Sequence, residues 1–289
     1  MKFNGIILEP STVCNLRCRG CTHTSPTFTR RHELMDIDLA KKCIEQIVTA
    51  GFTKVFMFGM GEPLLSDNII NMIKMAKENG LAVIISTNGN YHISNRDLYD
   101  SGIDKIIFSF DGMSQEVYEQ YRVGGKVQIL KRNIVELSVL NKRGMTIEAQ
   151  FIAFEWNITQ LELVEDFVAK LPTVTFNVKN TLYKPAPAHN AAKNRPTKED
   201  PFAYCLQPMI LVDGRVALCC RDFNGDYTIG DLSKGENLVD ILSKHPRKYD
   251  PANPLCVKQC PHLKNVKSSI RRSYLFILKH YISRFFRLN

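Results

Sequence analysis

Three cysteines near the N-terminus have the spacing of a metal-binding loop. Cys14, Cys18 and Cys21 lie within eight residues, in the pattern C-x3-C-x2-C. Four thiolates would complete a tetrahedral zinc site or a fully ligated iron–sulfur cluster. Three thiolates around a [4Fe–4S] cluster leave one iron without a protein ligand, and that iron can bind and activate a small molecule. Zinc with a distant fourth ligand is the alternative that the spacing leaves open.

The residues between these cysteines suit a cluster. Gly20 lets the loop curl before the last cysteine. Arg17 and Arg19 can offset the negative charge of three thiolates.

Residues 9–21, with the sequence EPSTVCNLRCRGC, resemble the cluster-binding loop of the radical S-adenosylmethionine (SAM) enzymes. In that family the amino and carboxylate groups of SAM chelate the open iron. An electron from the cluster then cleaves the sulfonium and releases a 5′-deoxyadenosyl radical. The resemblance implies that Cys14, Cys18 and Cys21 bind the cluster and that SAM lies beside it. Gly20 stands where the family often has an aromatic residue.

Alternating strands and helices must position this loop. Strands are expected at residues 3–8, 54–58, 82–86, 105–110, 147–153 and 174–178, and helices at 36–50, 68–78, 94–101, 114–121, 127–141 and 158–170. Repeated β-α-β units with short loops predict a parallel sheet. Six units are too few for a closed eightfold barrel. The resemblance to the radical SAM family implies an α/β fold, a partial (β/α)6 barrel over residues 1–183, and this agrees with the pattern. In any parallel architecture of this kind, ligands bind at the carboxyl ends of the strands.

Polar motifs follow these strands. Gly59-Met60-Gly61-Glu62-Pro63 resembles the family's Gly-Gly-Glu-Pro segment, which binds the SAM amino group. Ser86-Thr87-Asn88-Gly89 can hydrogen-bond a ribose or can cap a helix.

Ser109-Phe110-Asp111-Gly112 resembles the family's Ser-x-Asp-Gly segment. By that resemblance Ser109 faces the SAM ribose or carboxylate and Arg122 pairs with the carboxylate, although an ordinary salt bridge would also explain Arg122. Asp111 is interpreted as a turn residue, and Gln150 either points into the barrel or is a satisfied core amide. The predicted SAM contacts are Gly59, Gly61, Glu62, Ser86, Asn88, Ser109 and Arg122.

A second set of cysteines follows a polar, proline-rich linker at residues 184–203. A β-hairpin is expected to turn at Asp213-Gly214. Four thiolates from this region can hold a second [4Fe–4S] cluster or a zinc ion. The arrangement resembles the SPASM/twitch auxiliary-cluster domain, here shortened and placed at residues 204–264, with a short helix expected around 238–243 inside it. The family spacing selects Cys219 over Cys220, and the predicted ligands are Cys205, Cys219, Cys256 and Cys260.

Composition narrows the class of protein. The chain has 289 residues, 44% of them hydrophobic and 23% charged, as in an ordinary globular protein. Nine cysteines are too sparse for a disulfide scaffold and indicate a reducing, cytoplasmic compartment. Neither a signal peptide nor a membrane span is evident. Without the six basic residues of 267–289 the net charge falls from +9 to +3, so no nucleic-acid partner is expected.

The C-terminal tail, residues 265–289, is predicted to be a basic amphipathic helix. Such a helix can lie on the anionic inner face of a membrane, or it can pack against protein.

These observations predict a radical SAM enzyme, an oxidoreductase or transferase that removes a hydrogen atom from a peptide or from a small sugar- or cyclitol-like metabolite. Its cofactors would be SAM, the SAM-binding cluster and one auxiliary cluster, with flavodoxin or ferredoxin as electron donor. The alternatives are a zinc-binding scaffold without activity and an RNA-modifying enzyme of the same superfamily.

Overall fold

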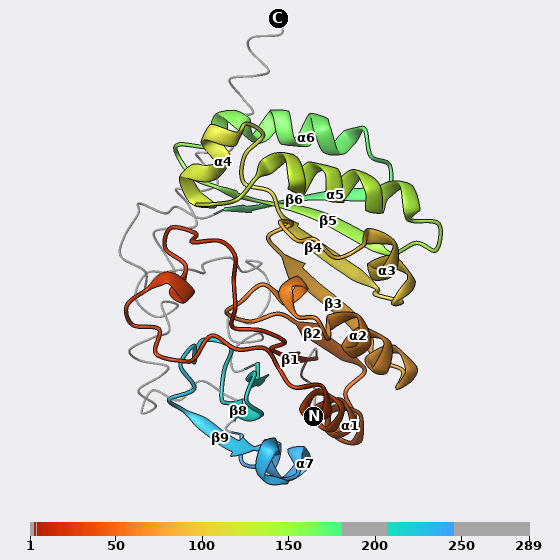
Figure 1. Ribbon diagram of the computed structural model, residues 1–289, viewed down its shortest axis with the longest axis vertical. Helices are drawn as coiled ribbons and strands as arrows, with labels where there is room; N and C mark the ends of the chain where they lie inside the picture. The colour runs from red at the N-terminus through yellow and green to blue at the C-terminus, as the bar shows by residue number, and fades with distance from the viewer. Residues whose placement is uncertain (1–2, 4, 181–206, 246–289) are drawn as a thin grey trace, which may run out of the picture.

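The computed structural model describes residues 3, 5–180 and 207–245, and it places a single sheet beside a layer of helices (Figure 1). The strands are β1 Ile6–Leu8, β2 Lys54–Met57, β3 Ala82–Thr87, β4 Lys105–Ser109, β5 Thr146–Ala153, β6 Val174–Asn180, β7 Met209–Ile210, β8 Arg215–Ala217 and β9 Thr228–Asp231. The helices are α1 Ile37–Thr49, α2 Ile69–Glu78, α3 Asn95–Asp100, α4 Gln115–Tyr121, α5 Val127–Leu140, α6 Leu161–Ala169 and α7 Leu238–Ser243. Each predicted strand and helix up to residue 180 is confirmed, as are the hairpin and the helix at 238–243.

The sheet has the order β6-β5-β4-β3-β2-β1-β7-β8-β9. Strands β1 to β7 pair in parallel, whereas β8 and β9 are antiparallel additions. This is the parallel sheet of the predicted partial barrel, and β6 and β1 do not pair with each other among the described strands. Because β7 pairs with β1, the hairpin extends the same sheet. The domain boundaries themselves stay predictions.

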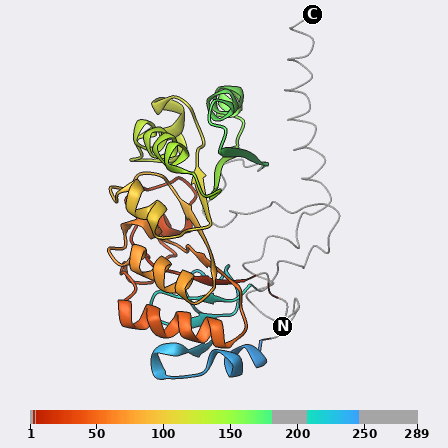
Figure 2. The same ribbon diagram turned by 90° about the vertical axis from the view of Figure 1, so that its right-hand side faces the viewer.

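The helices cover one face of the sheet, and Figure 2 shows α1, α2, α3 and α5 on the same side of it. α1 begins at Asp36, whose carboxylate accepts hydrogen bonds from the amides of Asp38 and Leu39. Cys43 lies on the buried stripe of this helix, as a core residue. Ser94 caps α3, as its place before the helix predicted.

The two faces of the sheet differ in chemistry because side chains alternate along a strand. The helix side of β3 and β4 carries Val83, Ile85 and Phe108, all buried. The opposite face carries polar, partly exposed side chains, among them Ser86, Ser109, Gln150 and Asn177. We call it the inner face.

Several predicted features lie outside the described residues. They are the linker 184–203, Cys205, Cys256, Cys260 and the tail 265–289. Within the described part, none of the helices combines the length and the apolar character that a bilayer crossing requires.

Candidate cluster and cofactor site

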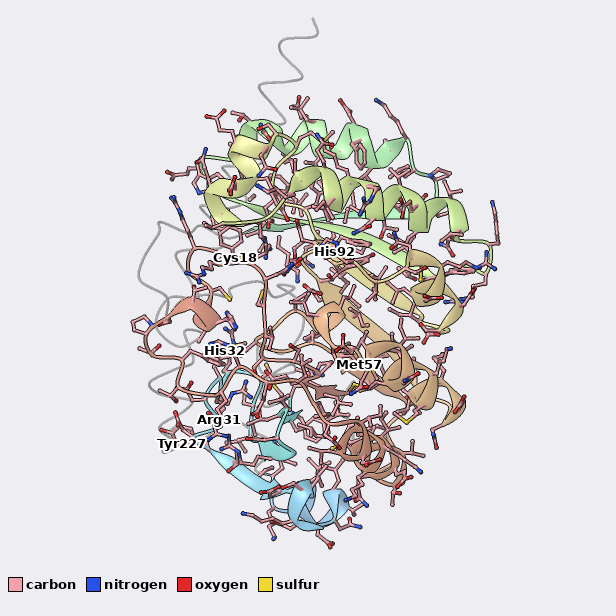
Figure 3. All side chains as sticks on the ribbon, in the orientation of Figure 1. Cys18, Arg31, His32, Met57, His92 and Tyr227 are labelled. Atoms are coloured by element: carbon pink, nitrogen blue, oxygen red, sulfur yellow. The ribbon has the colours of Figure 1, made fainter. Side chains whose placement is uncertain are left out.

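The cysteine loop follows β1 and is held in place by backbone hydrogen bonds. The amide of Arg17 donates to the carbonyl of Val123 at 2.9 Å, and the amide of Arg19 donates to that of Tyr121 at 2.9 Å. These bonds dock the loop against the segment that ends α4. Figure 3 labels Cys18 on this loop and Arg31 and His32 farther along it.

Two polar side chains approach the cysteine sulfurs. Asn88 Nδ2 lies 3.9 Å from Cys14 Sγ, and Arg122 Nη1 lies 3.6 Å from Cys18 Sγ. Burial, with smaller contributions from the charges of Glu62 and the other two cysteines, raises the pKa of Cys14 to about 12. Burial also raises the pKa of Cys21, with Cys18 adding to the effect. Without a metal these thiols therefore hold their protons, and metal binding would release them.

The residues present fit a [4Fe–4S] cluster held by three cysteines. An amide and a guanidinium donate toward the sulfurs, which is how proteins stabilise and tune such clusters. The loop supplies three thiols whose charges act on one another. In the part of the chain that the structure describes, no three His, Cys, Asp or Glu side chains are grouped to hold a single metal ion.

The glycines after β2 are required by packing against neighbouring protein. A Cβ atom on Gly61 would lie 2.5 Å from the carbonyl oxygen of Ser11 and 2.6 Å from that of Val13. The amides of Gly61 and Glu62 donate to these two carbonyls at 3.1 and 2.8 Å. Gly61 thus lets the backbone after β2 lie close against the cysteine loop.

Glu62 joins the loop after β2 to the loop after β3. Its carboxylate accepts hydrogen bonds from Thr87 Oγ1 at 2.7 Å, the amide of Asn88 at 2.7 Å and the amide of Leu64 at 3.1 Å. Burial raises the pKa of Glu62 to about 7, although these hydrogen bonds oppose the rise. The structure therefore brings the predicted Glu62 and Asn88 together. A contact of Glu62 with the SAM amino group stays a prediction.

Arg122 forms a buried ion pair with Asp111. Its Nε lies 2.6 Å from Asp111 Oδ2, and Asp111 Oδ1 accepts from the amide of Ile152 at 2.7 Å. The interpretation of Asp111 as a turn residue alone was therefore incomplete. The pairing of Arg122 with a SAM carboxylate stays a prediction, as does any contact of Ser86 and Ser109, which lie on the inner face.

Glu9 and Arg30 form a second buried ion pair, which the sequence analysis did not predict. Glu9 Oε2 lies 2.5 Å from Arg30 Nη1, and Oε1 lies 2.7 Å from Nη2. The same carboxylate accepts from the amides of Met60 and Val212 at 2.9 and 3.1 Å. A Cβ on Gly59 would lie 2.4 Å from Glu9 Cγ, so this glycine leaves room for the pair. The sequence did contain one signal for this pair: the acidic residue Glu9 directly follows the buried apolar strand β1.

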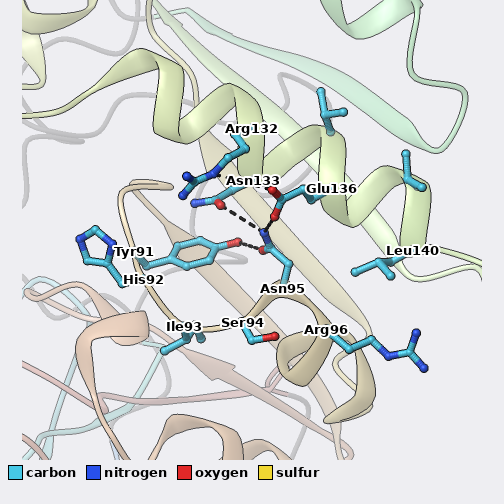
Figure 4. Close-up of a pocket in the computed structure, with 12 residues that line it drawn as sticks. Tyr91, His92, Ile93, Ser94, Asn95, Arg96, Arg132, Asn133, Glu136 and Leu140 are labelled. Atoms are coloured by element: carbon cyan, nitrogen blue, oxygen red, sulfur yellow. Dashed lines mark hydrogen bonds and ion pairs between the residues drawn. The ribbon is translucent and has the colours of Figure 1, made fainter.

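A pocket of about 600 Å³ lies between the loop after β3 and α5 (Figure 4). Asn95 is at its centre. Tyr91 Oη donates to Asn95 Oδ1 at 2.7 Å, and Asn95 Nδ2 donates to Asn133 and Glu136. Asn133 in turn donates to the carbonyl of Gly89 at 2.9 Å. This network fixes the loop that carries Asn88.

Of the second cysteine set, the structure describes Cys219 and its neighbour Cys220. Cys219 is buried two residues after the end of β8, and the amide of Cys220 donates to the carbonyl of Gln207 at 3.0 Å. The other three predicted ligands lie outside the described residues, so the choice between Cys219 and Cys220 stays a prediction.

Comparison with known proteins finds a family that resembles part of the chain. The sequence profile described as "Radical SAM superfamily" matches residues 8–148, which contain the cysteine loop and the motifs after β2, β3 and β4. This stretch of the chain is therefore similar to the radical SAM superfamily.

Among sequence relatives, the chain is 25% identical over 190 residues to a protein of Methanococcus maripaludis named "Probable GTP 3',8-cyclase". The match covers 65% of this chain and 62% of that relative, so the chain spans less than two thirds of its length.

Among solved structures, SuiB of Streptococcus suis bound to S-adenosylmethionine superposes with a TM-score of 0.63 and 14% identity, covering 84% of this chain and 66% of SuiB. BtrN in complex with AdoMet and 2-DOIA gives a TM-score of 0.51 and 19% identity, covering 83% and 82%. These likenesses establish the fold.

Proposed function

We propose that this chain cleaves SAM reductively at a [4Fe–4S] cluster on Cys14, Cys18 and Cys21, and that the product radical removes a hydrogen atom from a substrate. The observation that carries the proposal is the placement of Asn88 and Arg122 against two of the three cysteine sulfurs. When bound, the cluster and SAM supply the electron and the reactive carbon radical.

The chain's own residues would position these groups and keep the sulfurs from water. Arg122 would hold its positive charge at Cys18 because Asp111 fixes the guanidinium from the other side. Gly61 and Glu62 would keep the loop after β2 against the cysteine loop. Ser86 and Ser109, at the carboxyl ends of β3 and β4, would offer hydroxyl groups to SAM from the inner face.

The substrate in this proposal is a peptide or a small metabolite. Similarity of fold supports both classes, since SuiB is also known bound to precursor peptide SuiA and BtrN is known in complex with 2-DOIA. Flavodoxin or ferredoxin would supply the electron.

An anaerobic assay for 5′-deoxyadenosine with SAM and dithionite tests the central step. The wild-type chain should form the product and absorb near ~400 nm, whereas Cys18→Ala should fall to background. Cys43→Ala is the matched control, because Cys43 is a buried cysteine of α1 away from the loop, and it should retain activity. Equal product from wild type and Cys18→Ala would refute the mechanism. A colourless, zinc-loaded protein would favour the scaffold alternative.

The auxiliary cluster is a further part of the proposal, with Cys205, Cys219, Cys256 and Cys260 as ligands. It is supported by the position of Cys219, which lies two residues beyond the β7–β8 hairpin that pairs with β1. Iron analysis of the reconstituted chain should give about eight irons per wild-type chain and about four for Cys219→Ala. Cys220→Ala is the control and should keep about eight. The reverse result would assign Cys220 as the ligand in place of Cys219. A value of about four irons in the wild-type chain would exclude the second cluster.

A further inference from the structure

A cluster of charged and amide side chains occupies the inner face of β4, β5 and β6. Asn177 Nδ2 donates to Glu148 Oε1 at 3.0 Å, so these two side chains share this face. Lys179 lies two residues beyond Asn177 on the same strand, and its ammonium interacts electrostatically with Glu148 and Lys105. The period of two along a strand places Lys179 on the inner face with them.

The carboxylate of this cluster already has its partners. Lys105 Nζ lies 2.6 Å from Glu148 Oε2, and the amides of Gln150 and Asn177 donate to Oε1. Burial alone would raise the pKa of Glu148, but the hydrogen bonds from Lys105 and Asn177 outweigh it and lower that pKa. Glu148 is therefore an ionised group whose charge Lys105 offsets.

Lys179 is the surplus cation of the cluster. Its side chain is half-buried, and within the described ranges no carboxylate or other acceptor lies at hydrogen-bonding distance from its ammonium group. Burial lowers the pKa of Lys179, and Glu148 compensates only in part. A half-buried cation that has no hydrogen-bonding partner among the described residues is costly, and such groups concentrate at binding sites.

The position of Lys179 relates it to the cysteine loop. Lys179 pairs in register with Ile152 of the neighbouring strand. The amide of Ile152 donates to Asp111, which holds the guanidinium that reaches Cys18. Lys179 therefore lies at the end of the sheet where the proposed chemistry takes place.

We propose that Lys179 binds an anionic group of the substrate, a carboxylate or a phosphate, on the inner face beside the cluster site. This inference rests on the proposed function, because it says which charge the substrate of that reaction carries: a negative charge that Lys179 would bind. Glu148 and Lys105 are positioning residues in this proposal: their mutual neutralisation leaves Lys179 available.

Anion binding tests this without any turnover, so its failure is separate from failure of SAM cleavage. The full, cluster-loaded chain is labelled by reductive ¹³C-methylation of its lysines, and the Lys179 resonance is assigned as the one missing from Lys179→Gln. Inorganic pyrophosphate and citrate are then titrated separately. We expect a saturable shift of this resonance with at least one of them. Pyrophosphate alone would indicate a phosphate, citrate alone a carboxylate, and both a general anion site.

Charge-altered variants make the test sharper. Glu148→Gln leaves two unneutralised cations and should tighten the apparent Kd about tenfold, as expected for one additional charged hydrogen bond. Lys105→Gln lets Glu148 pair with Lys179 and should weaken the apparent Kd by about the same factor. Lys170→Gln, an exposed lysine after α6, is the control and should change nothing. Thermal unfolding followed by circular dichroism confirms that each variant is folded.

Three results would overturn the proposal. The first is the absence of a saturable Lys179 shift with either anion. The second is an equal shift of the Lys170 resonance, which would indicate non-specific binding. The third is a Glu148→Gln variant that is folded and binds no more tightly than wild type.

Discussion

Two buried acid–arginine pairs lie beside the cysteine loop, and they differ in what their arginines do. Arg30 gives both terminal nitrogens to Glu9 and its Nε to the carbonyl of Phe223, so this guanidinium is committed to protein oxygens. Arg122 gives Nε to Asp111 and turns one terminal nitrogen toward Cys18.

This difference indicates that the Glu9–Arg30 pair holds the fold together, whereas the Asp111–Arg122 pair acts on the cysteine loop. Glu9 gathers the ends of β1 and β7 and the loop after β2 through the amides of Met60 and Val212. Asp111 holds Arg122 so that one terminal nitrogen of the guanidinium faces the sulfur of Cys18. The first pair should therefore govern stability, and the second should govern the cluster.

Replacing the acid of the Glu9–Arg30 pair should have the largest effect on folding. Glu9→Ala leaves Arg30 buried without its counter-ion and should lower the free energy of unfolding by about 3–5 kcal/mol, measured by urea denaturation. Glu33→Ala, which removes a partly exposed acid of the same loop, is the control and should change it by less than about 0.5 kcal/mol. A loss below about 1 kcal/mol for Glu9→Ala would mean that the pair is not structural.

The pH dependence of the metal-free chain should reveal Glu62. Its pKa of about 7 in the folded chain lies above the ordinary value of 4.5, so its contribution to stability is fully present below pH ~4.5 and is lost as the pH rises through ~7. Glu62→Gln cannot ionise. The unfolding free energy of this variant relative to wild type should therefore rise between these pH values, by an amount on the order of 2–3 kcal/mol.

Urea denaturation at a series of pH values measures this difference. Glu45→Gln, on the exposed face of α1, supplies the baseline. Parallel pH profiles for wild type and Glu62→Gln would show that the Glu62 carboxyl titrates normally.

The cluster-facing pair should respond to Arg122→Lys mainly in activity. Lysine can keep the ion pair with Asp111 but lacks the fork that also reaches Cys18. The unfolding free energy should fall by only about 1 kcal/mol, while the rate of 5′-deoxyadenosine formation per folded molecule falls about tenfold. Arg30→Lys is the matched comparison. It should lower the unfolding free energy more than Arg122→Lys does, and it should change the rate of 5′-deoxyadenosine formation per folded molecule less. Normal activity per folded Arg122→Lys molecule would remove the distinction between the two pairs.

An exposed ion pair should contribute least to the stability of the fold. Arg96 and Asp100 on α3 are 2.7 Å apart but largely in solvent. Arg96→Gln should leave the midpoint of thermal denaturation unchanged, because water screens such pairs. A loss of stability as large as that of Glu9→Ala would instead show that distance alone ranks these ion pairs.

The repeating part of the chain was predictable because its signals are local. Hydrophobic periodicity, the Ser94 cap and the Asp213-Gly214 turn each specify a few neighbouring residues, and the elements appear where these signals placed them. The three-cysteine loop is also a local signal, since its three cysteines are close in sequence, and their role as cluster ligands stays a prediction.

The buried ion pairs were not predictable because their partners come from separate loops. Glu9 and Arg30 are joined across 21 residues without periodicity, and the amide of Val212 reaches Glu9 from 203 residues away. Asp111 and Arg122 lie in loops whose motifs suggest contacts with a cofactor, which hid their contact with each other. The need for glycine at position 59 was not predictable for the same reason, because the atoms that exclude a larger side chain there belong to Glu9.

The place of β1 in the sheet has a consequence for any shortened form of this protein. β1 has β2 on one side and β7 on the other, and its partner β7 comes from beyond residue 206. A chain that stopped after β6 would leave three apolar residues, Ile6 to Leu8, with unpaired amides and carbonyls along one border. Such a border recruits strands from other molecules, so the barrel residues alone should aggregate in proportion to their concentration.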